Sequence, residues 1–447
     1  MFCNNYLMSK KLSIIIFVLF LILGGIFGYL YFNSKSSAPV ATTTDNTGGS
    51  GGGFPTSQPI EGNTGGRAQN SANGSTTQFQ NPDTTFGGNQ PKNSSLRQIV
   101  NVPVAGATSY VDNRGQVVVR YLERETGHVQ DQPIQEKVPQ KVTDTTVPKI
   151  FDALFGKDGK FLVFQSLVGK SNQLSTAFAE IKKTPPPVKT ATSTTLIGED
   201  NLSTTVGTLD GALLPGTVHF VALSPDKTAY LYLNESSAGS LGVLIPGDKT
   251  KLEKSLTTVF TSKLTEWMPD WPAKDITTFT TRAGSGLAGS MYRINNATKQ
   301  KTALLSGVLG LTAKMSGDGT RVLYAEASGS GFIPHMLDTK TQAVANFSLR
   351  TLPEKCVWSK KTFSVVYCAV PSYVPAGAYP DDWYVGQMSF NDAIWKINTA
   401  TGETNMLASA ANNRTDSLDA YKLFYDDAEK NLFWINKKDS TVWTVAL

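Results

Sequence analysis

Residues 310–349 read GLTAKM, SGDG, TRVLYAEA, SGSG, FIPHMLD, TKT and QAVANFSL in order, so four strand-like segments alternate with polar turns. Each segment carries a run of alternating apolar residues, which is typical of a β-strand. Gly, Ser, Asp and Thr in the turns favour chain reversal. Four antiparallel strands joined in this way form one blade of a β-propeller. We therefore interpret residues 310–349 as one blade.

The same turn-then-strand pattern occurs seven times. The turns are NRG at 113–115, KDG at 157–159, PDK at 225–227, PAK at 272–274, GDG at 317–319, SKK at 359–361 and DDAEK at 426–430. Most successive turns are separated by about 45 residues, the period of a four-stranded blade. Two longer intervals have room for a blade and an insertion. The sequence predicts an all-β, seven-bladed β-propeller over residues 96–447.

The two ends of this region suggest how the ring closes. After the seventh turn the chain contains only NLFWINK and STVWTVAL, which leaves the last blade without an outer strand. The segment SLRQIVNVPVAGATSY at 95–110 resembles KTALLSGVLGLTAKM at 301–315, an outer strand followed by the next inner strand. We expect Leu96–Asn101 to complete the seventh blade. Closure of this kind removes exposed sheet edges.

The N-terminal part predicts a membrane anchor. Residues 12–32 are 21 residues without a charge, enough for a transmembrane helix. Lys10 and Lys11 precede this segment, so residues 1–11 are expected in the cytoplasm and the propeller outside it. A cleaved signal peptide is the alternative, but the apolar segment is longer than usual for one. Residues 33–95 are rich in Gly, Ser, Thr and Asn and are interpreted as a disordered linker.

Two insertions depart from the repeat. Residues 182–214, rich in Pro and Thr, predict a mobile surface loop. Residues 371–392 interrupt the sixth blade and bring aromatic rings next to carboxylates, a combination suited to sugar or peptide binding. The candidate binding residues are Tyr379, Asp381, Asp382, Trp383 and Tyr384. The alternative is that these rings fasten a long loop onto the propeller. On an extended chain the adjacent Asp381 and Asp382 would point apart.

Two of the three cysteines flank the sixth turn. A hairpin places Cys356 and Cys368 on neighbouring strands, and an extracytoplasmic position permits a disulfide between them. A turn centred near Lys361 would set Cys356 opposite Val366, so a bulge or longer loop is needed to join the two cysteines. Two buried thiols are the alternative. Two thiols without nearby histidines do not make a zinc site, so no metal is expected.

No local motif indicates catalysis. His128, His219 and His335 are scattered over different blades without metal-binding spacing, and no GxSxG sequence occurs. We expect no cofactor and no catalytic residue, although catalytic groups in a propeller could converge from separate blades. Lys and Arg exceed Asp and Glu by only five, with no basic block, so no nucleic-acid partner is expected.

The turns SPDK at 224–227 and SGDG at 316–319, each running into an apolar strand, resemble those of TolB-like and WD-repeat propellers. The segments TLPEKCVWSK, YPDDWYVG, IWKINTATGET and LFWINKKDSTVW resemble a group of single-span bacterial envelope propellers. This resemblance implies a seven- or eight-bladed fold and an extracytoplasmic position. The chain lacks the N-terminal α/β domain of TolB, so the resemblance does not extend to TolB's partner binding.

These observations together predict a membrane-anchored, extracytoplasmic propeller. The membrane is contacted through residues 12–32, and the expected role is non-catalytic binding or scaffolding of an envelope protein or glycan. A hydrolase or lyase acting on an envelope polysaccharide or peptide in the central channel is one alternative. It predicts a pocket lined by charged residues from separate blades. A structural envelope component is the other.

Overall fold

The structure is a computed structural model that describes residues 96–183, 206–214, 217–248, 256–409 and 418–447, all within the unit Ser75–Leu447. The predicted cytoplasmic segment, transmembrane helix and linker (residues 1–11, 12–32 and 33–95) lie outside these residues. Among the residues described, no helix combines the length and apolar character needed to cross a membrane. The predicted anchor therefore stays a prediction.

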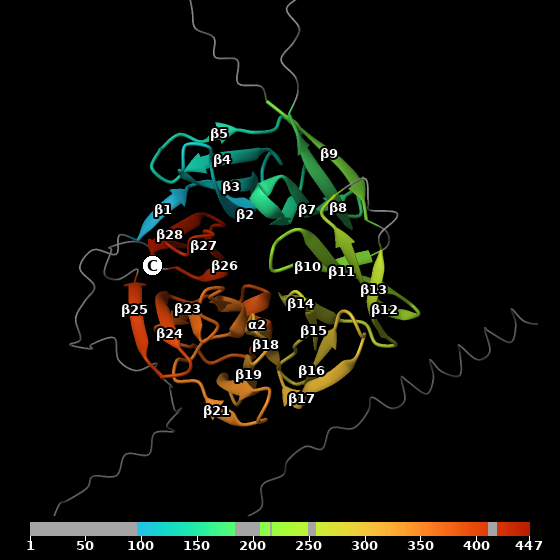
Figure 1. The fold of residues 1–447 in the computed structure, drawn as a ribbon, viewed down its shortest axis with the longest axis vertical. Coiled ribbons are helices and arrows are strands. Elements are labelled where there is room, and N and C mark those ends of the chain that lie inside the picture. The colour runs from blue at the N-terminus through green and yellow to red at the C-terminus, as the bar shows by residue number, and fades with distance from the viewer. Residues whose placement is uncertain (1–95, 184–205, 215–216, 249–255, 410–417) are drawn as a thin grey trace, which may run out of the picture. The chain divides into compact units, whose positions relative to one another are not determined.

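The described residues form seven four-stranded antiparallel sheets arranged around a central axis (Figure 1). This confirms the predicted all-β propeller and its blade number. Blade 1 contains β2 (Val104–Val111), β3 (Val117–Glu123), β4 (Val129–Pro133) and β5 (Gln140–Lys141). Blade 2 contains β6 (Ile150–Phe155), β7 (Phe161–Val168), β8 (Gln173–Lys182) and β9 (Thr208–Leu213). Blade 3 contains β10 (Thr217–Leu223), β11 (Ala229–Ser236), β12 (Gly239–Pro246) and β13 (Thr257–Ser262).

The remaining blades follow the same order. Blade 4 contains β14 (Trp267–Ala273), β15 (Ile276–Thr281), β16 (Ala288–Asn295) and β17 (Lys301–Leu309). Blade 5 contains β18 (Thr312–Met315), β19 (Arg321–Ser328), β20 (Gly331–Asp338) and β21 (Val344–Asn346). Blade 6 contains β22 (Cys356–Trp358), β23 (Val365–Pro371), β24 (Asp392–Asn398) and β25 (Thr404–Ser409). Blade 7 contains β26 (Ala420–Tyr425), β27 (Asn431–Asn436), β28 (Val442–Ala446) and β1 (Arg97–Val100).

Helical structure is limited to short elements in the described residues. They are η1 (Lys157–Gly159), η3 (Pro353–Lys355) and α2 (Asp381–Tyr384). The first lies in the turn between β6 and β7, η3 immediately precedes β22, and α2 lies in the insertion between β23 and β24.

Side-chain hydrogen bonds explain the SPDK and SGDG turns. The Ser316 hydroxyl donates to Asp318 Oδ1 over 2.6 Å and accepts the Arg321 N–H over 3.0 Å. Ser224 makes the equivalent contacts with Asp226 and with the Ala229 N–H. These local contacts satisfy backbone groups that the tight turn leaves without sheet partners. The turn residues that identified the repeat in the sequence therefore have a direct structural role.

The chain ends close the ring as the sequence predicted. β1 pairs antiparallel with β28 and supplies the fourth strand of blade 7, with Arg97 opposite Thr444 and Val100 opposite Val442. Val100 and Val442 belong to one buried cluster that also includes Val119 of blade 1. The N-terminal strand thus joins the last blade to the first.

The apolar core lies between neighbouring blades. The contact between blades 3 and 4 is representative: Leu231 and Phe260 pack against Trp267 and Phe279. The Phe260 and Phe279 rings stack with centroids 3.9 Å apart. Each blade packs both faces against its neighbours, which explains why the second strands β7, β11, β19 and β27 each bury at least four consecutive residues.

One detail of the sequence interpretation was wrong, and one question that it left open, the pairing of Cys356, is answered. The predicted surface loop 182–214 ends in a strand, because β9 (Thr208–Leu213) is the outer strand of blade 2. Residues 184–205 lie outside the described residues. In blade 6, Cys356 pairs directly with Cys368, not Val366, because the connection spans Ser359–Ser364 and shifts the register. The two cysteines form a disulfide, with Cα atoms 4.1 Å apart.

Candidate functional site

The first strand of each blade lies nearest the axis of the ring, as Figure 1 shows for β2, β10, β14, β18 and β26. Alternate residues of these strands point away from the inter-blade core. In β18 the central residues Ala313 and Lys314 are partly exposed between two buried residues, and in β14 every residue after Trp267 is partly exposed. These strands therefore build the wall of a central channel.

The channel contains a cavity of about 350 Å³, which we call the channel pocket. One side of it is apolar and is formed by Leu154 of β6 and residues 221–223 of β10. The other side comes from blades 4 and 5 and the segment before blade 6. It contains Met268, Pro269, Asp270, Thr280, Thr312, Ala313, Lys314 and Glu354. The pocket thus has an apolar wall facing a wall that carries three ionisable groups.

The protein provides hydrogen-bond partners for only some of the polar atoms on the charged wall. Asp270 Oδ1 accepts the Trp271 N–H over 2.8 Å. Glu354 Oε1 accepts a hydrogen bond from the Tyr384 hydroxyl, while Glu354 Oε2 and Thr312 Oγ1 have no partner of ordinary geometry among the described residues. Burial raises the pKa of Glu354, an effect that the hydrogen bond from Tyr384 and the charge of Lys314 partly oppose. The wall therefore retains hydrogen-bonding capacity for a ligand.

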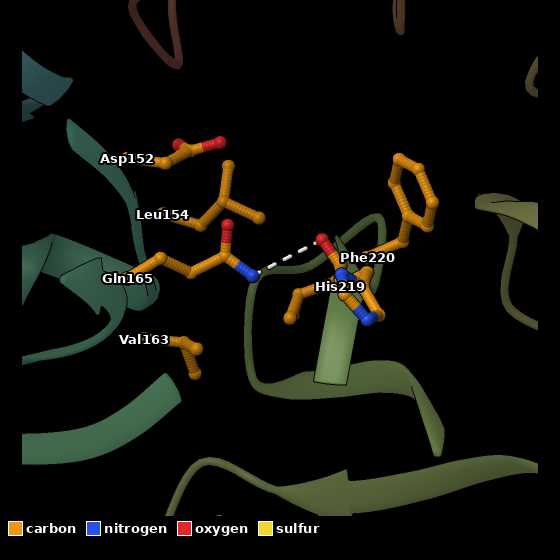
Figure 2. A pocket seen from close by; sticks show the side chains of 7 residues that line it. Asp152, Leu154, Val163, Gln165, His219 and Phe220 are labelled. Carbon is orange, nitrogen blue, oxygen red and sulfur yellow. Dashed lines mark hydrogen bonds between the residues drawn. The ribbon is translucent and has the colours of Figure 1, made fainter. Parts of the chain in front are cut away.

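A smaller side pocket of about 80 Å³ shares Leu154 and Val221 with the channel pocket. Figure 2 shows Asp152, Leu154 and Gln165 on one side of it and His219 and Phe220 on the other. The Gln165 amide donates to the His219 carbonyl over 3.1 Å and so joins blades 2 and 3. Asp152 forms an ion pair with Lys422 of blade 7. The side pocket is thus bordered by groups that the protein already pairs.

The insertion between β23 and β24 crosses one end of the ring. Its helical turn α2 lies toward the ring centre in Figure 1 and contacts three separate parts of the propeller. Asp381 Oδ2 accepts the Ser285 N–H of blade 4 over 2.8 Å, and Tyr384 donates to Glu354 before blade 6. Trp383 donates through Nε1 to Asp419 before blade 7, 3.1 Å from each carboxylate oxygen. α2 therefore bridges blades 4 to 7 and helps to position Glu354.

The five candidate binding residues lie together on this insertion, but their side chains contact the propeller. Tyr379 and Trp383 are buried, with 1% and 3% exposure. The carboxylates of Asp381 and Asp382 accept the backbone N–H groups of Ser285 and Ala378. The expectation that the two aspartates lie on an extended chain was wrong, because both belong to the first turn of α2. Ligand binding by these five residues stays a prediction.

A buried ion cluster lies beneath α2. The Lys355 ammonium, with 0% side-chain exposure, is 2.8 Å from Asp392 Oδ2 and 2.6 Å from Asp419 Oδ1. It also lies 5.1 Å from the centre of the Trp383 ring. Burial raises the pKa of Asp392 to about 6, although the Lys355 charge opposes this shift. The cluster joins the start of blade 6, the insertion and the start of blade 7, and no solvent reaches it.

The histidines are not brought together. His128 Nε2 lies 3.3 Å from the Thr146 hydroxyl in blade 1, and His335 Nε2 lies 3.2 Å from Glu326 Oε1 in blade 5. His219 borders the side pocket in blade 3. Over the described ranges, no group of three or more His, Cys, Asp or Glu side chains is placed to hold a metal ion.

Sequence reasoning missed the charged wall of the channel pocket. Asp270, Lys314 and Glu354 lie between 40 and 84 residues apart in the sequence and form no local motif. A signal was present: Asp270 and Lys314 interrupt the apolar pattern of inner strands, where a propeller channel is expected. Glu354 gave no such signal because it precedes its strand.

No family model matches the sequence, and no curated protein matches it. Solved structures with a similar fold include the tricorn protease, with 10% identity and a TM-score of 0.48 over 81% of this chain and 35% of that one. The match thus spans about a third of the tricorn protease.

Two further similar structures have lower scores. An oligogalacturonate lyase from Vibrio parahaemolyticus matches 79% of this chain and 98% of its own, with 8% identity and a TM-score of 0.43. TolB from Acinetobacter baumannii matches 76% of this chain and 78% of its own, with 10% identity and a TM-score of 0.37. These similarities concern the propeller fold alone, which is the fold that the SPDK and SGDG turns predicted.

Proposed function

We propose that the protein is an extracytoplasmic binding module, tethered to the membrane, that receives part of an envelope protein or glycan in its central channel. The observation that carries this proposal is the channel pocket of about 350 Å³, built by the inner strands of blades 2 to 5 and by Glu354. Binding pockets typically combine apolar walls with a few placed polar groups and have this order of volume. The pocket meets both conditions.

The disulfide supports the proposed compartment. Disulfides such as Cys356–Cys368 persist mainly in oxidising environments outside the cytoplasm. The uncharged segment 12–32, preceded by two lysines, supports the same orientation. A flexible linker of the length of residues 33–95 would let the propeller move roughly 40–45 Å from its anchor.

The proposal is tested by blocking the channel. Leu223→Arg places a long cationic side chain in the apolar wall of the pocket, whereas Leu241→Arg makes the same change at a position with 36% exposure away from it. Wild-type protein and both variants, each checked by thermal melting, are used to capture partners from solubilised envelopes. We expect a partner retained by wild type and Leu241→Arg but not by Leu223→Arg. Equal retention by all three proteins would contradict the proposal.

Catalysis in the same channel, by a hydrolase or lyase mechanism, is a second candidate function. The observation in its favour is that Asp270, Lys314 and Glu354 reach one cavity from different blade segments, as a channel hydrolase or lyase requires. Because burial raises the pKa of Glu354, this carboxyl group is suited to hold a proton for a leaving group. Turnover of envelope oligosaccharides or peptides that is abolished by Glu354→Gln would favour catalysis over binding alone.

A further inference from the structure

We propose that the ligand group held in the channel pocket is a compact zwitterion with an apolar side group, such as a short peptide with free ends. The inference rests on the proposed function, because it names the ligand class of the same channel. It follows from the separation of charged and apolar walls, from an unpaired lysine, and from polar atoms that the fold leaves without partners.

Lys314 supplies the positive group. Its residue lines the pocket from β18, and among the described residues its ammonium makes no hydrogen bond or ion pair. Its charge acts on Glu354 without a direct bond between them. A partly buried ammonium with three donors gains from an acceptor such as a carboxylate. The end of a ligand that meets Lys314 is therefore expected to be anionic.

The acceptors beside Lys314 require a donor. Thr312 has only 3% exposure and lines the pocket, and its hydroxyl makes no hydrogen bond of ordinary geometry within the described chain. It lies close enough to Glu354 to help lower the pKa of that carboxyl group. Glu354 Oε2 is buried in the same wall and likewise has no hydrogen-bond partner of ordinary geometry among the described residues. Buried polar atoms in native proteins nearly always have a partner. An ammonium group of the ligand donates hydrogen bonds to carboxylates and hydroxyls. It could therefore bind to Glu354, to Thr312 and to Asp270 through Oδ2.

The opposite wall selects an apolar side group. Leu154, Val221 and Leu223 come from blades 2 and 3 and carry no charge into the pocket. The cavity volume is near the lower end of the range for small-ligand sites, so the bound group must be compact. A neutral sugar would leave Lys314 unpaired in the pocket, and a polyanionic sugar would place charge against two carboxylates. A zwitterion has an anionic group for Lys314 and a cationic group for the two carboxylates.

The test uses the full-length protein in detergent and isothermal titration calorimetry. The probe is the dipeptide alanyl-leucine, compared with its N-acetyl form, its C-terminal amide and the neutral trisaccharide maltotriose. Loss of one partner from a buried charge pair weakens binding by about thirtyfold or more. We expect each blocked dipeptide to bind at least that much more weakly than alanyl-leucine, and maltotriose not to bind measurably.

Variants assign each charge to its residue. In Lys314→Met the free dipeptide and its C-terminal amide are expected to bind equally, because the group that distinguishes them is gone. In Asp270→Asn the free and N-acetyl dipeptides are expected to differ less than in wild type. Lys396→Met, at an exposed position on β24, serves as the matched control and should bind as wild type does.

The outcomes separate this inference from the proposed function. Equal binding of free and blocked dipeptides by wild-type protein, or tighter binding of maltotriose, overturns the zwitterion assignment. That comparison needs no variant, so a Lys314→Met protein that fails to fold does not weaken it. If the dipeptides do not bind but Leu223→Arg still abolishes capture of an envelope partner, the inference is wrong and the proposed function stands.

Discussion

Lys355 is the most deeply enclosed charge in the described part of the chain, and its environment makes its loss costly. Its ammonium contacts Asp392 and Asp419 and the Ala420 carbonyl, with no exposed surface. Lys355→Met would leave two buried carboxylates without a counter-charge. Such a change typically lowers the free energy of unfolding by about 3–5 kcal/mol. Urea unfolding of the full-length protein measures the difference.

Lys437 provides the control for this prediction. Its ammonium lies 5.4 Å from the centre of the Trp383 ring, but the Lys437 side chain is only partly buried. Lys437→Met is expected to lower the free energy of unfolding by less than about 1 kcal/mol. Equal losses for the two variants would mean that the buried pairs do not stabilise the fold.

Asp392 predicts a pH dependence of known sign. Burial raises its pKa in the folded protein from 3.8 to about 6, so in this range the folded state binds more protons than the unfolded state. The free energy of unfolding therefore falls as pH rises from about 4 to 6. Asp392→Asn cannot lose a proton, so its stability relative to wild type is expected to increase over the same window by up to about 3 kcal/mol. Urea unfolding at pH 4 and pH 7 measures this.

The pKa of Asp112 shifts in the opposite direction to that of Asp392, so Asp112 serves as a control. A hydrogen bond from the Gln116 backbone lowers the pKa of this partly buried carboxyl group. Its contribution is present at neutral pH and is lost as the solution becomes acidic. The stability difference between Asp112→Asn and wild type should thus be largest at neutral pH and shrink on acidification. A parallel response of the two aspartate variants would exclude the burial argument for Asp392.

At the scale of elements, the buried ring of Trp383 helps to fasten the insertion 371–392 to the propeller. Trp383 is buried among Tyr379 and Phe390 and hydrogen-bonded to Asp419. Trp383→Ala is expected to destabilise the protein by about 3–5 kcal/mol through the cavity and the lost hydrogen bond. Tyr373→Ala, in the same insertion but with a side chain at 38% exposure, should have little effect. Thermal unfolding distinguishes them, and unchanged stability of Trp383→Ala would mean that the ring is free to bind a ligand.

The strands and the insertion differ in how far their structures could be predicted. A segment such as TRVLYAEA contains its own apolar run and follows its own polar turn, so local sequence was enough to place β19. α2 depends on Ser285, Glu354 and Asp419, which lie 30 to 96 residues away from the residues they contact. Nothing within residues 371–392 shows these partners. For the same reason the aspartates were expected on an extended chain rather than in a helical turn.

The channel pocket shows a second limit of the sequence. Alternation tells which residues of β14 or β18 leave the core, but a residue can leave it toward the channel or toward bulk solvent. In sequence, Asp270 and Lys314 look like two polar residues that face bulk solvent. Only closure of the ring brings them to one cavity with Leu154. The candidate site is therefore a property of the arrangement of blades rather than of any one segment.

At the scale of the whole molecule, closure by β1 connects architecture to the proposed function. β1 follows directly after the predicted linker and pairs with β28, close to the end of the sequence. The strand that completes blade 7 is thus also the point at which the predicted tether meets the propeller. Val100 of this strand packs in one cluster with Val119 of blade 1, so the same strand also connects the last blade to the first.

The three cysteines allow the proposed topology to be tested in intact cells. Cys356 and Cys368 are paired, and Cys3, predicted on the cytoplasmic side, has no further cysteine in the chain to pair with. After denaturation with acid to prevent exchange, a maleimide polymer should modify one thiol per chain, and three after reduction. Cys356→Ser with Cys368→Ser should show one thiol in both conditions. Three reactive thiols before reduction would place the propeller in a reducing compartment, since an oxidised pair of this kind persists only where thiols are not continuously reduced.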